Sequence, residues 1–182
     1  MSIAEKINIG NKPIVLVGMM GVGKTTIGRR LAKTLKRDFI DTDIYIEREQ
    51  GVQIAEIFEK SGEAFFRKIE TKAVIALLEN KCSVIATGGG AVTNQDVLTA
   101  IKENSVSVWL KADPSILSRT LLFDTKRPLI KACNGDVDML ADRLSELSSQ
   151  RDPLYSQADI IVSAHEKNVV ETVKAITNRM SL

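Results

Sequence analysis

The chain has 182 residues, of which 44% are hydrophobic and 26% are charged. This composition is close to the globular average, so it excludes a wholly disordered chain, and the length suits a single domain. Lysine and arginine number 25 against 23 acidic residues, a net charge of +2, which excludes the strongly basic surface typical of a dedicated nucleic-acid-binding protein.

The amino-terminal part of the chain alternates between apolar strands and helices. Residues 13–17, Pro-Ile-Val-Leu-Val, form a short continuous apolar run, which is typical of a strand covered on both faces. Apolar side chains four residues apart predict a helix over residues 24–36. Phe39 and Ile40 predict a second strand, with residues 44–50 as a candidate helix after it.

The rest of the chain continues this alternation. Residues 63–79 carry an apolar stripe at helical spacing and predict a long amphipathic helix. Asp113, a capping carboxylate, precedes Pro114, and this pair predicts the start of another helix. The remaining predicted elements are three strands and a final helix, at residues 84–86, 106–110, 160–162 and 167–180.

Strands that alternate with helices predict an α/β fold with a parallel sheet between two layers of helices. We therefore expect a three-layer α/β/α sandwich around a five-stranded parallel sheet. Ligands bind such sheets beyond the carboxyl ends of the strands. Three segments of unusual composition follow predicted strands, at residues 18–25, 41–43 and 87–90, and we expect them to converge on one site.

The first of these segments is a phosphate-binding motif. Residues 18–25, Gly-Met-Met-Gly-Val-Gly-Lys-Thr, match G-x-x-x-x-G-K-[ST] between a predicted strand and a predicted helix. Its glycines let the backbone turn around an anion, and the following helix directs its positive end to the same phosphates. Lys24 is expected to reach the β- and γ-phosphates, and the Thr25 hydroxyl to bind Mg²⁺.

The second segment supplies two carboxylates. Asp41 ends an apolar strand, the position at which P-loop proteins hold magnesium directly or through water. If the segment is extended, Asp41 and Asp43 point the same way, one towards the metal and one towards an acceptor hydroxyl. The alternative is that residues 41–43 only cap the helix at residues 44–50.

Three arginines are candidates for binding an acidic acceptor. Arg67 lies three residues before Glu70, which could orient its guanidinium. Arg127 follows the helix that begins at Pro114, and Arg151 precedes Asp-Pro-Leu-Tyr. A guanidinium suits a carboxylate or a phosphate better than an ammonium does. The alternative for each arginine, taken alone, is a solvated surface charge.

Other residue types exclude several kinds of site. Cys82 and Cys133 are too few for a disulfide framework, so we expect separate thiols. His165 is the only histidine, which argues against a histidine-based triad and a zinc site. The chain shows no signal peptide and no apolar run of about 20 residues. We expect a cytoplasmic protein that binds neither a membrane nor nucleic acid.

Taken together, these motifs resemble those of the shikimate kinases, small P-loop enzymes related to the nucleoside monophosphate kinases. The resemblance extends over roughly residues 12–178. Its matching pieces lie at residues 18–26, 41–43, 66–70, 84–90, 127–130 and 151–155.

The resemblance implies one domain over residues 1–182, with a substrate-binding part at about 43–70 and a mobile lid at about 120–134. It implies transfer of the γ-phosphoryl group of MgATP to the 3-hydroxyl of shikimate, giving shikimate 3-phosphate on the route to chorismate and the aromatic amino acids. It also suggests a monomer whose partners are small molecules alone.

The resemblance further implies roles for particular residues. The catalytic residues would be Lys24, Asp43 and Arg127, and the metal would be bound through Thr25 and Asp41. ATP would be held by Gly21, Val22, Gly23, Lys24, Thr25, Thr26, Arg119 and Arg127. Shikimate would be held by Asp43, Arg67, Gly88, Gly89, Gly90 and Arg151.

Three other functions fit parts of the sequence. The first is another small-molecule kinase of the same fold, acting on a sugar acid or a nucleoside monophosphate. The second is a guanine-nucleotide switch, but the chain has neither D-x-x-G nor N-K-x-D. The third is a binding protein with a degenerate kinase fold, which the joint presence of Lys24, Thr25, Asp41, Asp43 and Arg67 disfavours.

Overall fold

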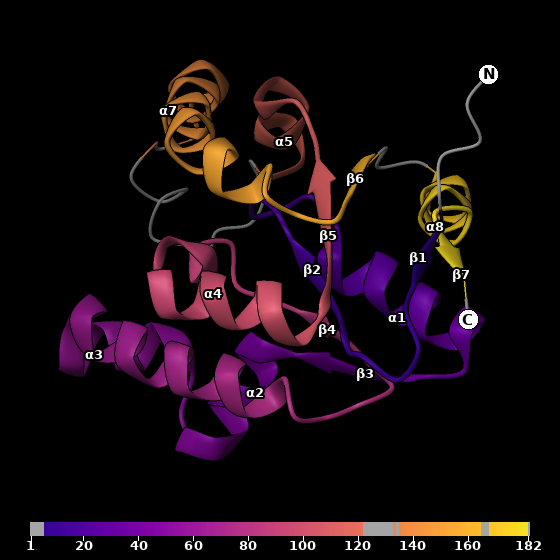
Figure 1. Ribbon diagram of the computed structural model, residues 1–182. Coiled ribbons are helices and arrows are strands. Elements are labelled where there is room, and N and C mark those ends of the chain that lie inside the picture. The colour runs from indigo at the N-terminus through magenta and orange to yellow at the C-terminus, as the bar shows by residue number, and fades with distance from the viewer. Residues whose placement is uncertain (1–5, 122–132, 134, 165–167, 182) are drawn as a thin grey trace.

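The computed structural model of the chain describes residues 6–121, 133, 135–164 and 168–181. Its centre is a five-stranded parallel sheet in the order β3-β4-β2-β5-β6, so the predicted α/β fold is confirmed (Figure 1). The strands are β2 (Ile14–Val17), β3 (Asp38–Asp41), β4 (Ser83–Ala86), β5 (Val106–Lys111) and β6 (Ile160–Ser163).

The central strands are buried on both faces. Every residue of β2 and β4 is buried, and Ile14 pairs with Val84 on one side and with Val106 on the other. A strand with helices on both faces has no polar side, which is why residues 14–17 are uniformly apolar.

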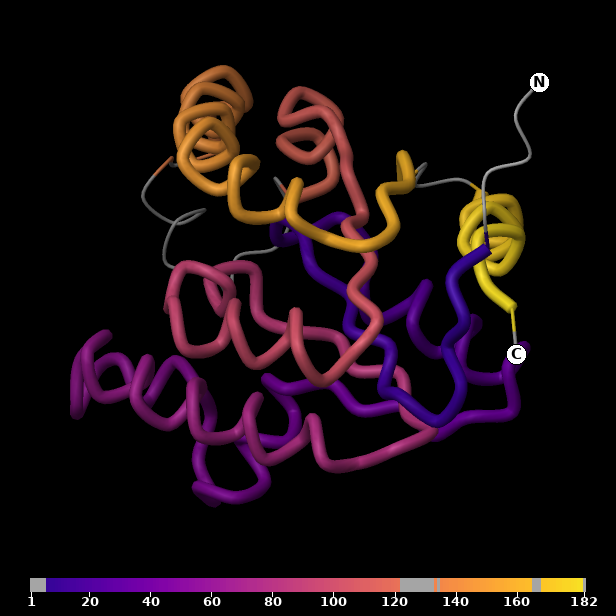
Figure 2. Tube along the Cα trace, in the orientation of Figure 1, coloured from indigo at the N-terminus to yellow at the C-terminus, as the bar shows by residue number. Residues whose placement is uncertain are grey.

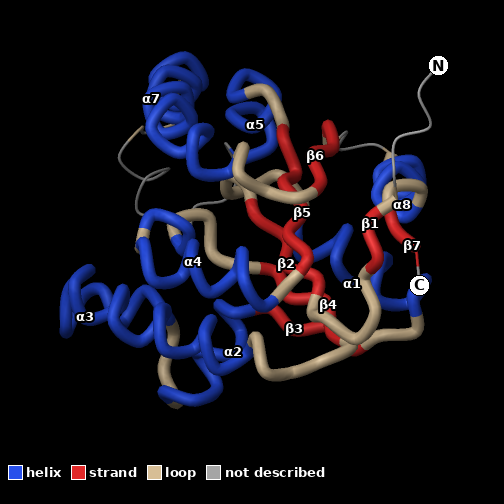
Figure 3. Tube along the Cα trace, in the orientation of Figure 1, coloured by secondary structure: helices blue, strands red, loops and turns tan. Residues whose placement is uncertain are grey.

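Helices form the outer two layers. In Figures 1 and 3, α1 and α8 cover one face of the sheet and α4 covers the other, with α3 packed beyond it, while α5 and α7 pack together near the carboxyl end of β5. The helices are α1 (Lys24–Leu35), α2 (Thr42–Gln50), α3 (Ile54–Leu77), α4 (Gln95–Asn104), α5 (Pro114–Leu121), α7 (Val137–Tyr155), α8 (Val169–Thr177) and the 3₁₀ helix η1 (Ala91–Thr93).

The helix predicted at residues 63–79 differs from the structure at its start. Helix α3 begins at Ile54, and Gly62 interrupts it with a φ of +77°. A glycine in this left-handed conformation interrupts the periodic apolar pattern, so the pattern did not predict the first part of the helix. Helices α4 and α7 were not predicted, although the side chains of Asn94 and Asp136 accept hydrogen bonds at their starts.

The last predicted helix, at residues 167–180, is too long. Helix α8 ends at Thr177, and Met180 lies instead in β7 (Met180–Ser181), paired in parallel with β1 (Ile7–Asn8). Met180 is buried as predicted, but in a strand. Figure 2 shows the first and last described segments side by side beside α8. Strands of two residues carry no periodicity, so the sequence could not reveal this small sheet.

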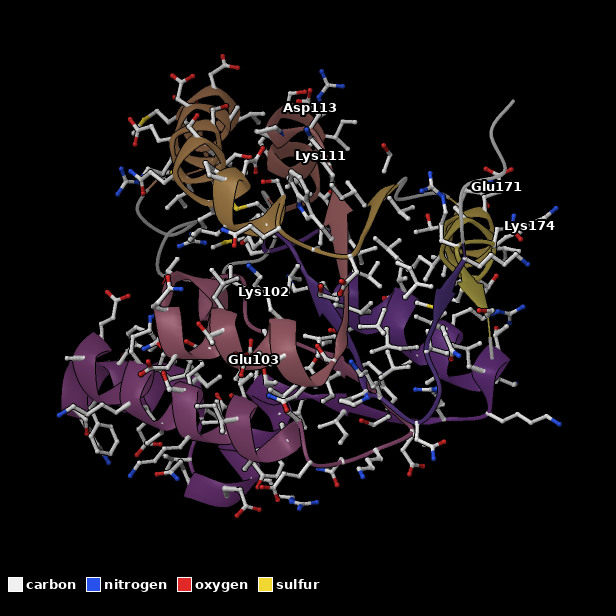
Figure 4. The ribbon with its side chains drawn as sticks, viewed as in Figure 1. Lys102, Glu103, Lys111, Asp113, Glu171 and Lys174 are labelled. Carbon is white, nitrogen blue, oxygen red and sulfur yellow. The ribbon has the colours of Figure 1, made fainter. Side chains whose placement is uncertain are left out.

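Charged side chains lie on the outer surfaces of the helices. Figure 4 shows Lys102 and Glu103 on α4, and Glu171 and Lys174 on α8, all of them exposed. None of the helices in the described ranges is both long and apolar enough to cross a bilayer. Cys82 is exposed and Cys133 is buried, and neither forms a disulfide among the described residues. His165 lies outside the described residues.

Candidate active site

The P-loop, residues 18–25, connects β2 to the first residues of α1. Gly18 has a φ of +137°, and a Cβ there would lie 2.5 Å from the carbonyl oxygen of Leu110, so only glycine fits. The Lys24 ammonium donates to the carbonyl oxygens of Gly18 at 2.7 Å and Met19 at 2.9 Å. No side chain caps the start of α1, which leaves its first N–H groups for a phosphate.

Thr25 and Asp41 lie together beside this loop. The Thr25 hydroxyl donates to Asp41 Oδ2 at 2.7 Å, while Asp41 Oδ1 accepts from the N–H of Asp43 at 3.1 Å. A hydroxyl and a carboxylate are the hard oxygen ligands that Mg²⁺ prefers. No group of three or more His, Cys, Asp and Glu side chains that could hold a metal occurs within the described ranges. The pair therefore fits an ion that also takes oxygens from phosphate and water.

The expected geometry of the two aspartates is wrong in one respect. Asp41 ends β3 and caps α2, so Asp43 lies in the first helical turn rather than in an extended segment. The alternation of an extended chain does not apply to it. Capping by Asp41, which was the competing interpretation, is correct and coexists with its contact to Thr25.

Arg67 is held by two carboxylates of its own helix. Its Nη1 donates to Glu70 Oε2 at 2.6 Å, as the spacing of three residues predicted. Its Nε and Nη2 donate to Glu63 Oε1 at 3.2 Å and 3.0 Å. A guanidinium has five N–H donors, so one remains on each Nη nitrogen. The side chain of Arg67 is 32% exposed, which leaves this fork accessible to a ligand.

Glu70 is the most deeply buried acid of the site. Its side chain is 3% exposed, and Oε1 has no hydrogen-bond partner among the described residues. Burial raises its pKa, the contact with Arg67 opposes that shift, and the nearby charge of Asp43 adds to it. A Cβ at Gly88 would lie 2.5 Å from Glu70 Oε1 and 3.2 Å from Asp43 Oδ1. The carboxylates of Asp43 and Glu70 therefore both lie close to Gly88.

The three glycines after β4, Gly88, Gly89 and Gly90, lie between the P-loop and Arg67. The N–H of Gly88 donates to the Thr42 hydroxyl at 3.1 Å. A Cβ at Gly89 would lie 3.1 Å from the Met20 nitrogen of the P-loop, and one at Gly90 would lie 2.8 Å from Arg67 Nη1. Side chains at these positions would separate the P-loop from Arg67, so the close approach requires glycine.

Arg151 approaches the same glycines from α7. Its Nη1 lies 3.4 Å from the carbonyl oxygen of Gly89, and the Tyr155 hydroxyl donates to that oxygen at 2.5 Å. Sequence reasoning did not select Thr42, Glu63 or Tyr155. Thr42 and Tyr155 did lie in segments that the sequence singled out, 41–43 and 151–155, whereas nothing pointed to Glu63.

The three segments that follow the strands converge, as predicted. They enclose a pocket of ≈190 Å³. A larger hollow of ≈500 Å³ lies at the opposite, amino-terminal end of the sheet, but its lining does not include these groups. The smaller pocket is lined by Met20, Gly21, Gly23, Lys24, Thr25, Thr26, Asp41, Asp43, Ala86, Thr87, Gly88 and Gly89.

Among the described residues, two predicted ATP contacts do not line this pocket: Val22, which is buried, and Arg119. Arg119 is exposed on α5, a helix that reaches the P-loop through Leu121, whose Cγ would lie 2.7 Å from a Cβ at Gly21. Arg127 lies outside the described residues, as does most of the expected lid at 120–134.

Known proteins are similar to this chain in sequence. A sequence model of the family described as shikimate kinase matches residues 20–181. The shikimate kinase of Bradyrhizobium diazoefficiens is 40% identical over 172 residues, covering 92% of this chain and 81% of that protein. The shikimate kinase of Caldanaerobacter subterraneus subsp. tengcongensis is 41% identical over 165 residues, covering 91% of this chain and 94% of that protein.

Solved structures agree with the sequence comparison. The shikimate kinase from Acinetobacter baumannii in complex with shikimate is 36% identical with a TM-score of 0.84, covering 91% of this chain and 90% of that chain. A gluconokinase from Sinorhizobium meliloti 1021 is 17% identical with a TM-score of 0.60, covering 93% of this chain and 91% of that chain, so it shares the fold alone. By the family match, the identities and the shared structure, the chain belongs to the shikimate kinase family.

Proposed function

We propose that this chain transfers the γ-phosphoryl group of ATP to the 3-hydroxyl of shikimate. One observation carries the proposal: a P-loop and a second binding surface with Asp43, Arg67 and Arg151 meet at the same three glycines. A triphosphate at one end and a small hydroxylated acid at the other are the ligands that suit these two halves. Family membership supports the same reaction.

The phosphate half of the site would hold ATP. Lys24 and the N–H groups at the start of α1 would contact the phosphate oxygens. The backbone of Gly21, Val22 and Gly23 would surround them, with Thr26 at the edge of the pocket. Mg²⁺, held through Thr25 and Asp41, would supply positive charge between the phosphates when bound.

The acceptor half would hold shikimate by both of its functional groups. The free N–H donors of Arg67, together with Arg151 and the backbone at Gly88, Gly89 and Gly90, would bind its carboxylate, because a guanidinium fork matches a carboxylate in shape and charge. Asp43 would accept a hydrogen bond from the reacting hydroxyl.

Catalysis would consist mainly of positioning and charge neutralisation. Phosphoryl transfer passes through a loose transition state, so little proton transfer is needed early. Asp43 would therefore first orient the hydroxyl and then accept its proton after the new O–P bond forms. Lys24, with Arg127 from the expected lid, would stabilise the negative charge of the ATP phosphates, and Arg119 would lie near the adenine.

The remaining assignments belong to the same proposal. Residues 1–182 form one domain, with the substrate-binding part at about 43–70 and the lid at about 120–134. The protein acts as a monomer in the cytoplasm, on small molecules, with neither a membrane nor nucleic acid as a partner. Its product would enter the route to chorismate and the aromatic amino acids.

A coupled assay of ADP release tests the proposed function. Shikimate, gluconate and AMP are offered in parallel, each with and without Mg²⁺. We expect ADP release with shikimate that depends on Mg²⁺, and none above background with the other two acceptors. Release with gluconate or AMP alone would establish a different kinase of this fold, and binding without any ADP release would establish a binding protein.

A further inference from the structure

One buried tyrosine touches both halves of the site. Tyr155, 1% exposed, is the last residue of α7. Its hydroxyl donates to the carbonyl oxygen of Gly89 at 2.5 Å and lies 3.9 Å from the sulfur of Met19 in the P-loop. The carbonyl of Met19 in turn accepts a hydrogen bond from Lys24. A single phenol therefore connects the glycine turn to the loop that would hold ATP.

The surroundings of Tyr155 fix its ring and keep its hydroxyl protonated. The ring packs on Trp109, with centroids 5.8 Å apart. Pro153 lies inside α7 two residues earlier, where it cannot continue the helical hydrogen bonds. Burial raises the pKa of the Tyr155 hydroxyl to about 12. The hydroxyl therefore remains a donor over the whole neutral pH range.

The accepting carbonyl belongs to the peptide between Gly89 and Gly90. In a trans peptide the C=O and the following N–H point in opposite directions. Holding the Gly89 oxygen towards Tyr155 thus turns the N–H of Gly90 to the other side of the peptide plane. A Cβ at Gly90 would lie 2.8 Å from Nη1 and 2.9 Å from Nη2 of Arg67, so this peptide lies against the guanidinium.

The same contact affects Arg151. Its Nη1 reaches the Gly89 oxygen only at 3.4 Å, whereas the Tyr155 hydroxyl lies at 2.5 Å. The guanidinium of Arg151 also contacts the phenol. Because the phenol takes the closer position on the carbonyl, the remaining donors of Arg151 stay available to an acidic ligand. Without the phenol, Arg151 would become the closest donor to that oxygen and would be drawn towards it.

We propose that Tyr155 is a positioning residue for the acceptor. Its hydroxyl holds the Gly89–Gly90 peptide and leaves Arg151 available, so that both present donors to the carboxylate of shikimate. The inference rests on the proposed function, because it assigns Tyr155 to the shikimate half of that site.

Tyr155→Phe removes the hydroxyl and keeps the ring. The chain has two tyrosines, so Tyr45→Phe, in α2, is the matched control. We expect Tyr155→Phe to raise the KM for shikimate about three- to tenfold, the effect of losing one hydrogen bond. Its kcat and its KM for ATP should stay within about twofold. The Kd for shikimate, followed by the fluorescence of Trp109, should rise by the same factor.

Two results would overturn the inference. One is a folded Tyr155→Phe protein whose KM and Kd for shikimate equal those of Tyr45→Phe. The other is an equal rise in the KM values for ATP and shikimate, because that shows general loosening of the core. A wild-type protein that does not phosphorylate shikimate refutes the proposed function instead, and the two failures are thereby distinguished.

A second measurement decides the matter even if Tyr155→Phe does not fold. Tyr45→Phe produced with 3-fluorotyrosine carries a single fluorine label, at residue 155. We expect its ¹⁹F resonance to shift when shikimate is added without nucleotide. A resonance that shikimate leaves unchanged, while Trp109 fluorescence reports binding, would overturn the inference.

Discussion

Replacing Arg67 by alanine tests the acceptor half of the site, and the chain supplies its own control. Arg67 and Glu70 form an ion pair three residues apart at 2.6 Å, and so do Arg143 and Glu146. The two pairs differ in burial: the side chains are 32% and 3% exposed in the first, and 56% and 60% in the second. Arg143→Ala thus removes the same contact from a solvated surface.

The two substitutions should differ in their effect on shikimate. A charge-assisted hydrogen bond to a substrate carboxylate contributes roughly 1.5–3 kcal/mol, so Arg67→Ala should raise the KM for shikimate about ten- to hundredfold. Arg143 is exposed on α7, where its guanidinium contacts Glu146, so Arg143→Ala should leave that KM unchanged. The KM for ATP should be unaffected by either substitution.

The two substitutions should also differ in stability. Arg67→Ala leaves the buried Glu70 without its cation, which costs roughly 1.5–3 kcal/mol after allowance for the partial exposure of Arg67. For a chain of this size that lowers the Tm by about 3–12 °C. An exposed pair such as Arg143 and Glu146 contributes about 0–1 kcal/mol, so its loss should lower the Tm by no more than about 4 °C.

The stability loss should depend on pH in a definite direction. Burial raises the pKa of Glu70 above its ordinary value of 4.5, and Arg67 opposes that rise. Without Arg67 the folded carboxyl holds its proton more tightly than the unfolded one. Above the ordinary pKa the unfolded state then binds fewer protons than the folded state, so stability falls as pH rises. The loss in Arg67→Ala should be small at about pH 4 and larger at about pH 7.

Steady-state kinetics and thermal unfolding at these two pH values measure both effects. Equal KM values for shikimate in Arg67→Ala and Arg143→Ala would refute the assignment of Arg67 to the acceptor. A stability loss that is as large at about pH 4 as at about pH 7 would refute the explanation through Glu70.

Four substitutions at three further positions test the site. Lys24→Ala should lower kcat by at least about a hundredfold with an unchanged circular dichroism spectrum, since the ammonium would stabilise the transferring phosphate; near-normal turnover would contradict its role. Gly90→Ala should raise the KM for shikimate about tenfold, because the added Cβ would lie 2.8 Å from Arg67 Nη1 and displace the guanidinium. It should change the Tm little, because the φ of −97° at Gly90 suits alanine. An unchanged KM would show that this guanidinium does not hold the acceptor. Thr25→Ser should keep the Mg²⁺ concentration for half-maximal activity and Thr25→Val should raise it, and equal values in a magnesium titration would remove Thr25 from the metal site.

The parallel sheet could be predicted because its signal is local. Each of the five strands of the main sheet contains short apolar stretches, and each was placed to within one residue at either end. The errors lie where the pattern is broken or too short. Gly62 conceals the start of α3, and the two-residue strands β1 and β7 have no periodicity to detect.

The contacts within the site also fall into two groups, those that could be predicted from the sequence and those that could not. The P-loop and the pair of Arg67 with Glu70 follow from residues close together in sequence, so their spacing predicted their contacts. Other contacts join distant segments: Gly88 and Thr42 are 46 residues apart, and Tyr155 and Gly89 are 66 residues apart. No local pattern encodes such a pair.

The sequence by itself determined the five strands of the main sheet, several of the helices between them, the anion-binding motif and the kinds of side chain that face a ligand. Tertiary structure alone decided that Asp43 lies in a helical turn, that Glu70 is buried with one oxygen unpartnered among the described residues, and that Tyr155 holds the Gly89 carbonyl. The reason is that periodicity and short motifs act over a few residues, whereas the tertiary fold brings together groups that are 46 and 66 residues apart.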